Sequence, residues 1–429
     1  MGIVRMRHLW PPLMGGAPTY GQRVLALPGL VAYWPLDEIS GTVATSLTAI
    51  PNGAYTNAPA LANAPFPSGG AAPLFNGVDE AVNIYSAALS AALNWATGWA
   101  LAWVRIPNAA VWLDATGRNA LNLYVDGSNA IQITKGVTNN ELRVSYEGAN
   151  TIVYAVLPAG SARWIQVAMR WSAGALTASR DGVDIGTVAG VVTGAGNLSV
   201  SYSAIAASRG NGAASQWSGN VAHVAIGAGA VPTEAQLEQL WHVVYPGARE
   251  ITFSGDSKTA GDSWCNLLAA GIEATTGLVW RERPPRLAVG GYNAAQLHTY
   301  IDANAPGVLG EPSIICLNIG INDLTAGTAE ATFKTQLVGC IDGLRTRWPS
   351  ASIYIACPWL RGKNVQAAAM KVWIAAVIAL YATGVAAGPD ETVWLEGGND
   401  GATMTVDGTH YSAAGQLAAA AQWLTALGY

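Results

Sequence analysis

The sequence predicts two folded domains of different class, an all-β domain followed by an α/β domain. At 429 residues the chain is long enough for two domains of ordinary size, and an apolar fraction of 51% is enough to fill two cores. In the first part apolar and polar residues alternate in short segments, whereas in the second part short apolar runs alternate with longer helical patterns. We therefore expect domains at 29–247 and 248–429, preceded by a leader or attachment segment at 1–28.

The first domain reads as a series of strands and hairpins. LNLYVDGSNAIQITKG (121–136), for example, alternates apolar and polar residues on both sides of a DG turn, which is typical of antiparallel strands. Many such strands with little helix predict a β-sandwich. One helix, expected over 232–244 with Thr233 as its N-cap, closes this half.

The second domain reads as alternating strands and helices. Strands are expected at 250–254, 313–320, 352–357 and 392–396, and helices at about 262–275, 293–304, 328–347, 364–383 and 412–427. The strands are almost wholly apolar, which indicates a parallel sheet buried between two layers of helices. In such sheets ligands bind at the carboxyl ends of the strands, so we look for chemistry there.

Charge and hydropathy exclude two classes of partner. Charged residues make up only 11% of the chain and the net charge is −5, so neither half offers the basic surface that nucleic acids need. No uncharged apolar run is long enough to span a bilayer, and the first 21 residues lack the unbroken apolar core of a secretory signal. We expect no nucleic-acid partner and no membrane insertion.

The cysteines carry no signal for a metal site or a disulfide framework. Cys265, Cys316, Cys340 and Cys357 form no CxxC pair, and no His/Cys cluster has zinc-ligand spacing. Cys316 and Cys357 stand in apolar, strand-like runs, where buried free thiols are expected. We therefore expect no metal and no other cofactor.

Three motifs at the expected strand ends contain the residue types of an acyl-transfer site. GDS follows the first strand, GIND follows the second, and DGTH precedes the last helix. A serine such as Ser257 needs a base, and the imidazole of His410 is the usual kind near neutral pH. Asp407 can bond one ring nitrogen and leave the other for serine. The Asn322 side chain and a backbone N–H such as that of Gly291 suit an oxyanion.

Each motif alone also has a structural interpretation. GDS is typical of a turn, DGTH of a turn with a helix cap, and Asn322 of a residue that bridges backbone groups in its loop. These interpretations leave the joint order of the motifs unexplained.

The joint order resembles the GDSL-type, or SGNH, hydrolase family. GDSKTAG at 255–261 is similar to the family's first block GDSxTxG, GIND at 320–323 to GxND, and DGTH at 407–410 to DxxH. The resemblance covers about 249–429 and implies a three-layer, flavodoxin-like α/β fold. It implies a serine esterase in which Ser257 is the nucleophile, His410 the base and Asp407 the residue that holds the imidazole.

The resemblance also implies an oxyanion hole. Its donors would be the backbone N–H groups of Ser257 and Gly291 and the side chain of Asn322. VGGYNAAQL at 289–297 matches the family's glycine block only loosely, so Gly291 is the better candidate and Gly290 the reserve.

A second GDS triplet ends in Ser263, which competes with Ser257 for the role of nucleophile. Ser263 falls inside the first expected helix, whereas Ser257 directly follows the strand. We therefore prefer Ser257. The site also differs from the GxSxG elbow of α/β-hydrolases, because Thr259 stands where that motif needs its second glycine.

Four further polar or aromatic residues near the motifs have weaker interpretations. His298 is expected to be a surface or helix-packing residue and Asp323 to organise its loop. Trp359 and Arg361, which follow the third strand, either line the pocket or simply pack.

The first domain resembles concanavalin A-like, laminin-G-type lectin domains. LVAYWPLDEISG (30–41) and FNGVDEAVNI (75–84) carry the resemblance. Such domains often bind glycans, sometimes with calcium, but no compact acidic cluster here predicts a calcium site. The tryptophans either stack on sugar rings or belong to the core.

Together the two resemblances predict a carbohydrate O-acetylesterase, a deacetylase that acts on acylated polysaccharide. The missing signal, the low charge and the leader at 1–28 fit a phage tail fibre or tailspike subunit, located in the virion or outside the cell. In that setting the leader would dock to virion tail proteins and the chain would assemble as a homo-oligomer, commonly a trimer. This step rests on domain analogy.

Two alternatives stay open at this point. One is a lipolytic esterase or thioesterase whose sandwich is merely structural. The other is a non-catalytic glycan-binding adhesin, against which the intact set of Ser257, Asn322, Asp407 and His410 argues.

Overall fold

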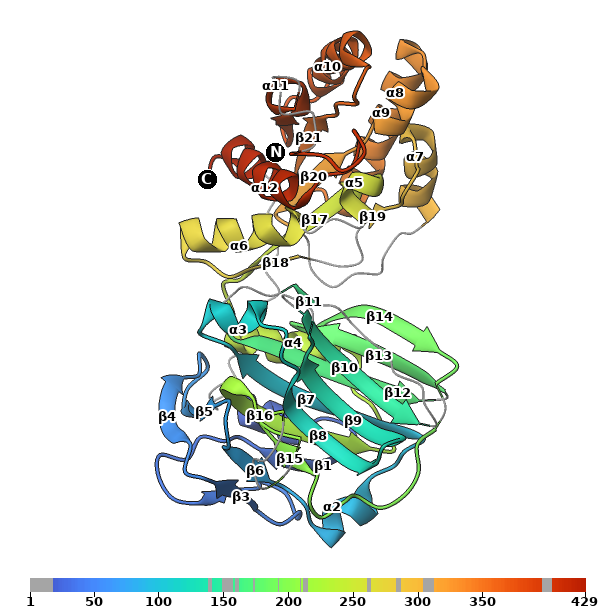
Figure 1. The fold of residues 1–429 in the computed structure, drawn as a ribbon. Coiled ribbons are helices and arrows are strands. Elements are labelled where there is room, and N and C mark those ends of the chain that lie inside the picture. Colours follow the sequence, from blue (N-terminus) through green and yellow to red (C-terminus); the bar gives the residue numbers. More distant parts are fainter. Residues whose placement is uncertain are drawn as a thin grey trace, which may run out of the picture.

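Two antiparallel sheets and one parallel sheet make up the fold of the computed structural model (Figure 1). The structure describes residues 18–137, 141–148, 157–158, 162–172, 174–191, 193–208, 210, 215–260, 264–282, 287–303, 312–395 and 403–429. The antiparallel sheets lie in the N-terminal half and the parallel sheet in the C-terminal half.

The N-terminal half is a β-sandwich, as predicted. One sheet has the order β14-β13-β12-β7-β16-β5-β4, with β1 also paired to β16, and the other has the order β11-β10-β9-β8-β15-β6-β3-β2. Its strands are β1 Leu30–Trp34, β2 Val43–Ala44, β3 Gly53–Thr56, β4 Ala60–Pro65, β5 Ala71–Asn76, β6 Ala81–Asn83, β7 Thr97–Arg105, β8 Arg118–Asp126, β9 Asn129–Lys135, β10 Glu141–Gly148, β11 Leu157–Pro158, β12 Ile165–Ser172, β13 Ala175–Arg180, β14 Val183–Ala189, β15 Ala204–Ile205 and β16 Ser218–Ala228. Its helices are α1 Tyr20–Leu25, α2 Ala87–Ala92, α3 Ala109–Leu113 and α4 Glu234–Val244.

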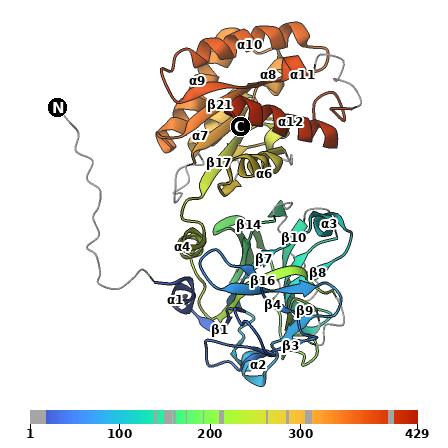
Figure 2. The same cartoon turned by 90° about the vertical axis from the view of Figure 1, so that its left-hand side faces the viewer.

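Strand β7 shows why the sandwich needs covering helices. Ala102 and Val104 point into the core between the two sheets, and because side chains alternate along a strand, Leu101 and Trp103 point to the opposite face. Helices α1 and α4 cover that second apolar face (Figure 2).

Helix α4 begins where the sequence predicts. Thr233 is its N-cap, and the Thr233 and Gln236 side chains form a reciprocal capping box. Helix α1 lies within the predicted leader, and its Tyr20 and Val24 belong to the core under α4. The described part of the leader, residues 18–28, therefore packs on the sandwich; the domain boundaries themselves stay a prediction.

The C-terminal half is a parallel sheet covered by helices, as predicted. The strands are β17 Arg249–Gly255, β18 Trp280–Glu282, β19 Leu287–Ala288, β20 Ile314–Asn318, β21 Ser352–Cys357 and β22 Val385–Asp390. The helices are α5 Ser257–Ala260, α6 Trp264–Thr276, α7 Ala294–Ala303, α8 Ile321–Ala326, α9 Glu330–Arg347, α10 Asn364–Ile378, α11 Glu391–Trp394 and α12 Ala413–Leu427. The strand order is β18-β17-β20-β21-β22, with β19 also paired to β17.

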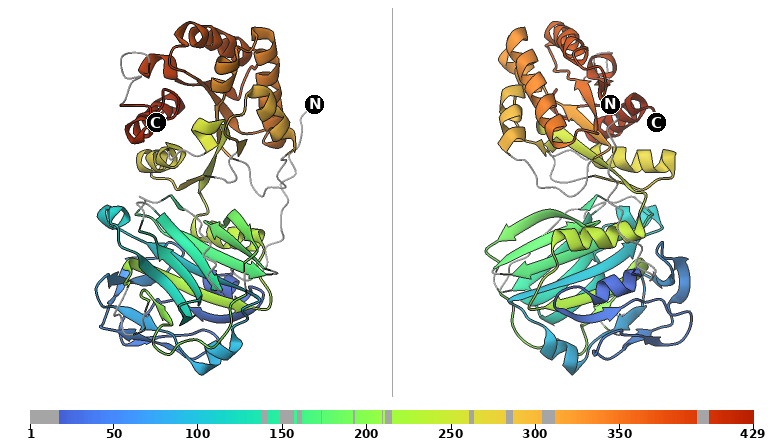
Figure 3. Two further views of the ribbon diagram at one scale, coloured as in Figure 1. Left: turned by 45° about the vertical axis from the view of Figure 1, so that its right-hand side comes forward. Right: turned by 180° about the vertical axis from the view of Figure 1, so that it is seen from behind.

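The helices of this half form two groups. Helices α6 and α12 pack together through the stacked rings of Trp264 and Trp423, and α7, α9 and α10 form the second group (Figure 3). All four cysteines are buried free thiols in this half. Among the described residues, no helix is both long and apolar enough to cross a membrane.

The strand predicted at 392–396 is wrong. The last strand that the structure describes is β22, Val385–Asp390, and Glu391–Trp394 is the short helix α11. The sequence hides this strand because Gly388-Pro389 is typical of a turn, yet an edge strand such as β22 tolerates proline. The Asp390 side chain then accepts a hydrogen bond from the Thr392 backbone N–H (3.0 Å) and caps α11.

Buried ion pairs join the sandwich to the parallel sheet. Arg281 on β18 pairs with Glu250 on β17 and with Glu238 on α4. Its guanidinium also lies 4.1 Å from the centre of the Trp241 ring. These contacts lie at the first residues of β17. A strand of seven residues spans about 20 Å, so the end of β17 that carries Ser257 lies far from this interface (Figure 1).

Candidate active site

The loop after β17 places Ser257 at the carboxyl edge of the sheet. Gly255 has a φ of +156°, and a Cβ there would overlap the carbonyl oxygen of Asn318 on the neighbouring strand. The backbone N–H groups of Thr259 and Ala260 donate to the Asp256 carbonyl (3.0 and 2.9 Å). The chain therefore turns sharply from strand to helix at glycine and presents Ser257 at the start of α5.

Ser257, His410 and Asp407 form a continuous chain of hydrogen bonds. The Ser257 Oγ lies 2.9 Å from His410 Nε2, and His410 Nδ1 lies 2.7 Å from Asp407 Oδ2. Because a carboxylate can only accept, Nδ1 carries the proton and Nε2 is left to accept the serine proton. The structure thus brings together the three residues predicted as nucleophile, base and orienting carboxylate, in the arrangement of a catalytic triad.

A tight turn holds Asp407 under His410. The second carboxylate oxygen, Oδ1, accepts hydrogen bonds from the backbone N–H groups of Thr409 and His410 (both 2.8 Å). The bonds from the His410 side chain and backbone lower the pKa of Asp407 to about 2. Asp407 is therefore ionised near neutral pH.

The predicted oxyanion donors Ser257, Gly291 and Asn322 lie on three loops. Asn322 follows Gly320 in the first turn of α8 and donates one amide hydrogen to the Tyr292 carbonyl (2.9 Å), which leaves its second amide hydrogen for a substrate. In the described part of the chain, the backbone N–H groups of Ser257 and Gly291 donate no hydrogen bond. A Cβ on Gly290 would lie 3.8 Å from the Ser257 Cβ, so this glycine loop borders the serine and both glycines stay candidates.

Asp323 connects two of the three donor loops. Its Oδ2 accepts a hydrogen bond from the Ala294 backbone N–H (2.9 Å) at the start of α7, directly after the glycine loop. Burial raises the pKa of Asp323. Asp323 thus links the Asn322 loop to the glycine loop, in keeping with the expectation that it organises its surroundings.

The other residues singled out in the sequence lie in different settings. Ser263 lies outside the described residues. His298 bonds Gln336 on α9 (3.0 Å), as expected of a helix-packing residue. Trp359 is fully buried and donates its ring N–H to Asn364 (3.0 Å), whereas Arg361 is exposed and its backbone N–H donates to the Gly408 carbonyl (3.3 Å). Of this pair, Arg361 alone borders the triad.

Sequence reasoning missed a buried ion pair behind the serine. Lys258, the residue after Ser257, pairs with Glu391 at 2.6 Å (Nζ to Oε2), and both side chains are excluded from solvent. A lysine in a GDSK loop is usually exposed, and Glu391 fell beside the wrongly placed strand. With β22 placed correctly, Glu391 directly follows a strand. A carboxylate at a strand end would have been a sequence signal for a residue near the site.

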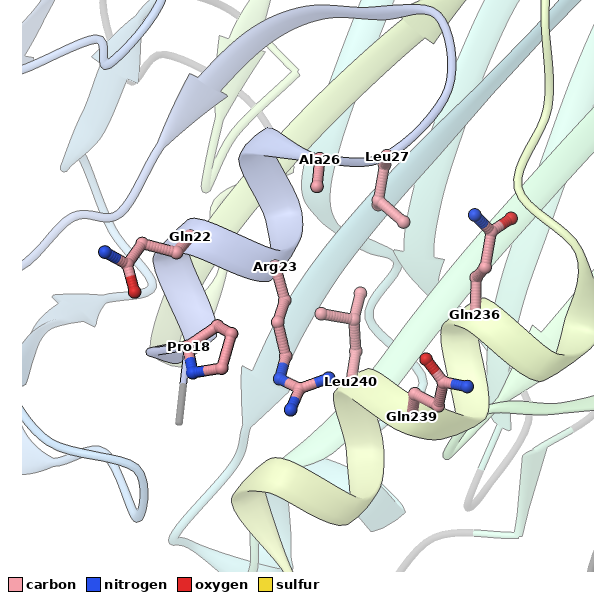
Figure 4. Close-up of a pocket in the computed structure, with 8 residues that line it drawn as sticks. All are labelled: Pro18, Gln22, Arg23, Ala26, Leu27, Gln236, Gln239 and Leu240. Atoms are coloured by element: carbon pink, nitrogen blue, oxygen red, sulfur yellow. The ribbon is translucent and has the colours of Figure 1, made fainter. Parts of the chain in front are cut away.

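Two other features lie away from the triad. Glu238, His242 and Glu250 bring ligand atoms within 4.8 Å of one another, but Arg281 already pairs with both carboxylates, so we assign this group to the interface. A groove of about 640 Å³ lies between α1 and α4 (Figure 4). It is lined by Pro18, Gln22, Arg23, Ala26, Leu27, Gln236, Gln239 and Leu240.

Comparison with protein families decides the class of the C-terminal half. Residues 253–418 match the model of the GDSL-like Lipase/Acylhydrolase family. They form a GDSL-like domain. The matched range contains Ser257, Asn322, Asp407 and His410, and it leaves the sandwich outside the family. No curated protein sequence matches the chain.

Solved structures resemble the chain only distantly. A Trypanosoma rangeli sialidase in complex with sialic acid is 18% identical with a TM-score of 0.39, covering 50% of this chain and 32% of that chain. A Clostridium thermocellum family 3 carbohydrate esterase is 19% identical with a TM-score of 0.35, covering 42% and 94%. Domain 4 of a GH43 arabinanase from Geobacillus stearothermophilus is 15% identical with a TM-score of 0.37, covering 49% and 97%. The chain thus spans about a third of the sialidase, and these scores are too low to carry an argument about the GDSL-like domain.

Proposed function

We propose that the GDSL-like domain is a serine esterase. The observation that carries the proposal is the hydrogen-bond chain from Ser257 through His410 to Asp407, with distances of 2.9 and 2.7 Å, at the carboxyl edge of a parallel sheet. His410 takes the proton of Ser257 as the Oγ attacks an ester carbonyl, and the ionised Asp407 stabilises the imidazolium. The imidazolium then protonates the alcohol oxygen as the ester C–O bond breaks, which leaves the acyl group on Ser257. In the second half, His410 takes a proton from water as the water attacks the acyl-serine carbonyl, and returns a proton to the Ser257 Oγ as the carboxylic acid leaves.

The oxyanion of the tetrahedral intermediate meets donors from three loops. We assign the backbone N–H groups of Ser257 and Gly291 and the free amide hydrogen of Asn322. The bond from Asn322 to the Tyr292 carbonyl fixes the amide before substrate arrives, and such preorganised donors cost no reorganisation during the reaction.

We further propose that the substrate is an acylated polysaccharide and the reaction a deacetylation. The site is open, because the side chains of His410 and Asp407 are 40% and 51% exposed. Among the described residues beside the triad, Arg361 is exposed and polar, and Val406 is an exposed apolar side chain next to Asp407. One valine does not make the long apolar groove that a fatty acyl chain needs, whereas an open polar surface suits a short acyl group on a bulky sugar polymer.

The sandwich serves this reaction mainly as a scaffold. Eight of its tryptophans are buried, namely Trp34, Trp99, Trp103, Trp112, Trp164, Trp171, Trp217 and Trp241. They belong to the core and are not free to stack on sugar rings. We propose that the sandwich is of the concanavalin type, and that the parallel sheet, whose order counts 2-1-3-4-5 from β17 without β19, is flavodoxin-like.

We also propose that the chain works as a homo-oligomer, a trimer, attached to a phage virion. The support is the low charged fraction of 11% together with apolar side chains on the outer faces of α10 and α12. Val365, Val372 and Leu417 are 81%, 66% and 62% exposed there. Light scattering coupled to size exclusion tests the assembly: a mass near 133 kDa, about three chains of 44.3 kDa, supports it and a 44.3-kDa species contradicts it.

The enzymatic proposal is tested with p-nitrophenyl esters from acetyl to decanoyl, using wild type and Ser257→Ala. We expect acetyl preference that the substitution abolishes, and release of acetate from acetylated bacterial polysaccharides. A preference for long chains points to a lipolytic esterase, activity that survives the substitution excludes Ser257 as the nucleophile, and a folded wild type that cleaves neither substrate class contradicts the proposal.

A further inference from the structure

A carboxylate with four donors lies buried beneath the triad. The Glu391 Oε2 accepts hydrogen bonds from Lys258 Nζ (2.6 Å) and the Trp359 backbone N–H (3.0 Å). Its Oε1 accepts from the Asn318 side chain (3.3 Å) and from the Tyr411 hydroxyl. The side chains of Glu391 and Lys258 are 2% and 0% exposed, so solvent does not share this cluster.

The carboxylate and its donors lie at the ends of four strands of the sheet and in the loop before α12. Lys258 follows β17, Asn318 ends β20, Trp359 follows β21, and Glu391 itself follows β22. Tyr411 precedes α12 and also faces the Lys258 ammonium, which lies 5.0 Å from the centre of its ring. One carboxylate therefore joins the ends of four strands to the loop that carries the histidine.

Two of the donors are chain neighbours of the reacting residues. Lys258 directly follows Ser257, and Tyr411 directly follows His410. The Lys258 backbone N–H also donates to Asp256 on the other side of the serine (3.1 Å). A displacement of Glu391 would thus move both ends of the Ser257–His410 hydrogen bond, which is 2.9 Å long.

The pair is difficult to explain by stability alone. Removing two charges from water costs about as much as their attraction returns, and apolar residues of similar size often stabilise a protein equally well or better. What a buried ion pair does provide is a fixed geometry, because each charged group is held in one place by directional bonds.

We propose that Glu391 is a positioning residue for acyl transfer. Through Lys258 and Tyr411 it holds Ser257 and His410 at the separation that proton transfer requires. This inference rests on the proposed serine esterase function.

The test compares a double variant, in which both charges are removed, with the two single variants and with wild type. Glu391→Gln or Lys258→Met alone leaves one buried charge unpaired and is expected to lower the melting temperature. Lys258→Met/Glu391→Gln removes both charges, so we expect a folded protein that melts near wild type. Tyr411→Phe removes one hydroxyl and keeps the ring. Lys371→Met is the matched control, since it breaks the ion pair (2.5 Å) between the exposed Lys371 and the partly buried Asp390, which precedes Glu391 in the chain.

Two readouts separate positioning from folding. For p-nitrophenyl acetate, we expect kcat of the double variant to fall on the order of 10²-fold and that of Tyr411→Phe on the order of 10-fold, with KM within about twofold of wild type. The rate at which a small fluorophosphonate modifies Ser257 should fall in parallel. Lys371→Met should match wild type in both.

The outcomes distinguish this inference from the proposed function. A folded double variant with wild-type kcat and phosphonylation rate overturns the positioning role while the esterase stands. A rise in KM at constant kcat also overturns it, because it assigns Glu391 to substrate binding. A folded wild type that neither hydrolyses esters nor reacts with the fluorophosphonate overturns the esterase and, with it, the positioning role.

Discussion

At the scale of single residues, the candidate site is built by side chains that are distant in the chain. Ser257 and His410 are 153 positions apart and still lie in hydrogen-bond contact. Both were predicted from the sequence by residue type and place, because Ser257 directly follows a strand and His410 precedes the last helix. The tautomer of His410 and the hydrogen bond from Asn322 to the Tyr292 carbonyl follow only from the folded structure, because both depend on the positions of other residues.

The burial of Lys258 shows where residue-level prediction stops. Its charge is neutralised by Glu391, 133 positions away, and no local pattern reveals a partner at that distance. A lysine next to a nucleophile reads as a solvated side chain unless the partner is known.

Asp407→Asn tests the orienting role of the carboxylate. The amide can donate to His410 Nδ1 and stabilise the wrong tautomer, so we expect kcat to fall on the order of 10⁴-fold. The side chain is half exposed, so the melting temperature should stay close to that of wild type. Asp302→Asn, at a carboxylate that is 58% exposed in the same domain, is the control. A loss of less than tenfold in Asp407→Asn contradicts the assignment.

Asp256 predicts a pH-dependent stability. Burial, opposed by the nearby charge of Lys258, raises the pKa of Asp256 from 3.8 to about 7. The folded state therefore holds a proton that the unfolded chain loses near pH 4. The contribution of Asp256 to the free energy of unfolding is present below that pH and is lost as pH rises towards 7, at up to about 1.4 kcal/mol per pH unit.

The measurement for Asp256 is urea unfolding of wild type and Asp256→Asn between pH 4 and pH 8. Asparagine carries no charge, so the variant should gain stability relative to wild type as pH rises. Two curves that stay parallel over this range would show that Asp256 does not titrate as the buried geometry implies.

At the scale of elements, periodicity and caps predicted most of the fold. Helix α4 begins after Thr233, and β21 occupies the predicted residues 352–357. The error fell on β22, whose Gly388 and Pro389 break the apolar pattern that marks a strand. Strand pairing makes β22 a strand despite its composition, and pairing is a tertiary property that a single segment does not show.

Gly320→Ala tests how an element positions a site residue. Gly320 precedes α8 with a φ of +121°, and a Cβ there would lie 2.9 Å from Met370 Sδ. We expect the variant to lose on the order of 1–3 kcal/mol of stability and to lower kcat by displacing Asn322. Gly327→Ala is the control, because it also has a positive φ (+68°) at the other end of α8 but has open space around it. Equal kcat values of Gly320→Ala and Gly327→Ala, measured at a temperature at which both variants are folded, would contradict the role of Gly320 in positioning Asn322.

At the scale of the whole molecule, the interface between the sandwich and the GDSL-like domain lies far from Ser257. Alternating patterns and apolar runs were enough to separate an all-β half from an α/β half. The interface was not predictable, because Arg281, Glu238 and Glu250 lie on three different elements and each reads as an exposed charge in its own segment.

Arg281→Met tests this separation of interface from site. The substitution removes the guanidinium that pairs with two buried carboxylates, so we expect a loss on the order of 3–5 kcal/mol of stability. Activity per folded molecule should stay unchanged, since Ser257 lies at the opposite end of β17. Calorimetry measures the loss of stability. The hydrolysis rate divided by the concentration of active sites, obtained by active-site titration, gives the activity per folded molecule. An unchanged melting temperature, or a loss of kcat at temperatures where the variant is folded, contradicts the account.

The most direct test of the central claim is to locate the nucleophile. Wild-type protein is treated with a small fluorophosphonate, digested, and the modified residue is identified by peptide mass spectrometry, with His410→Ala as the comparison. We expect one adduct, on Ser257, that forms much more slowly in His410→Ala than in wild type. An adduct on Ser263, or labelling of Ser257 at the same rate in His410→Ala, would contradict it.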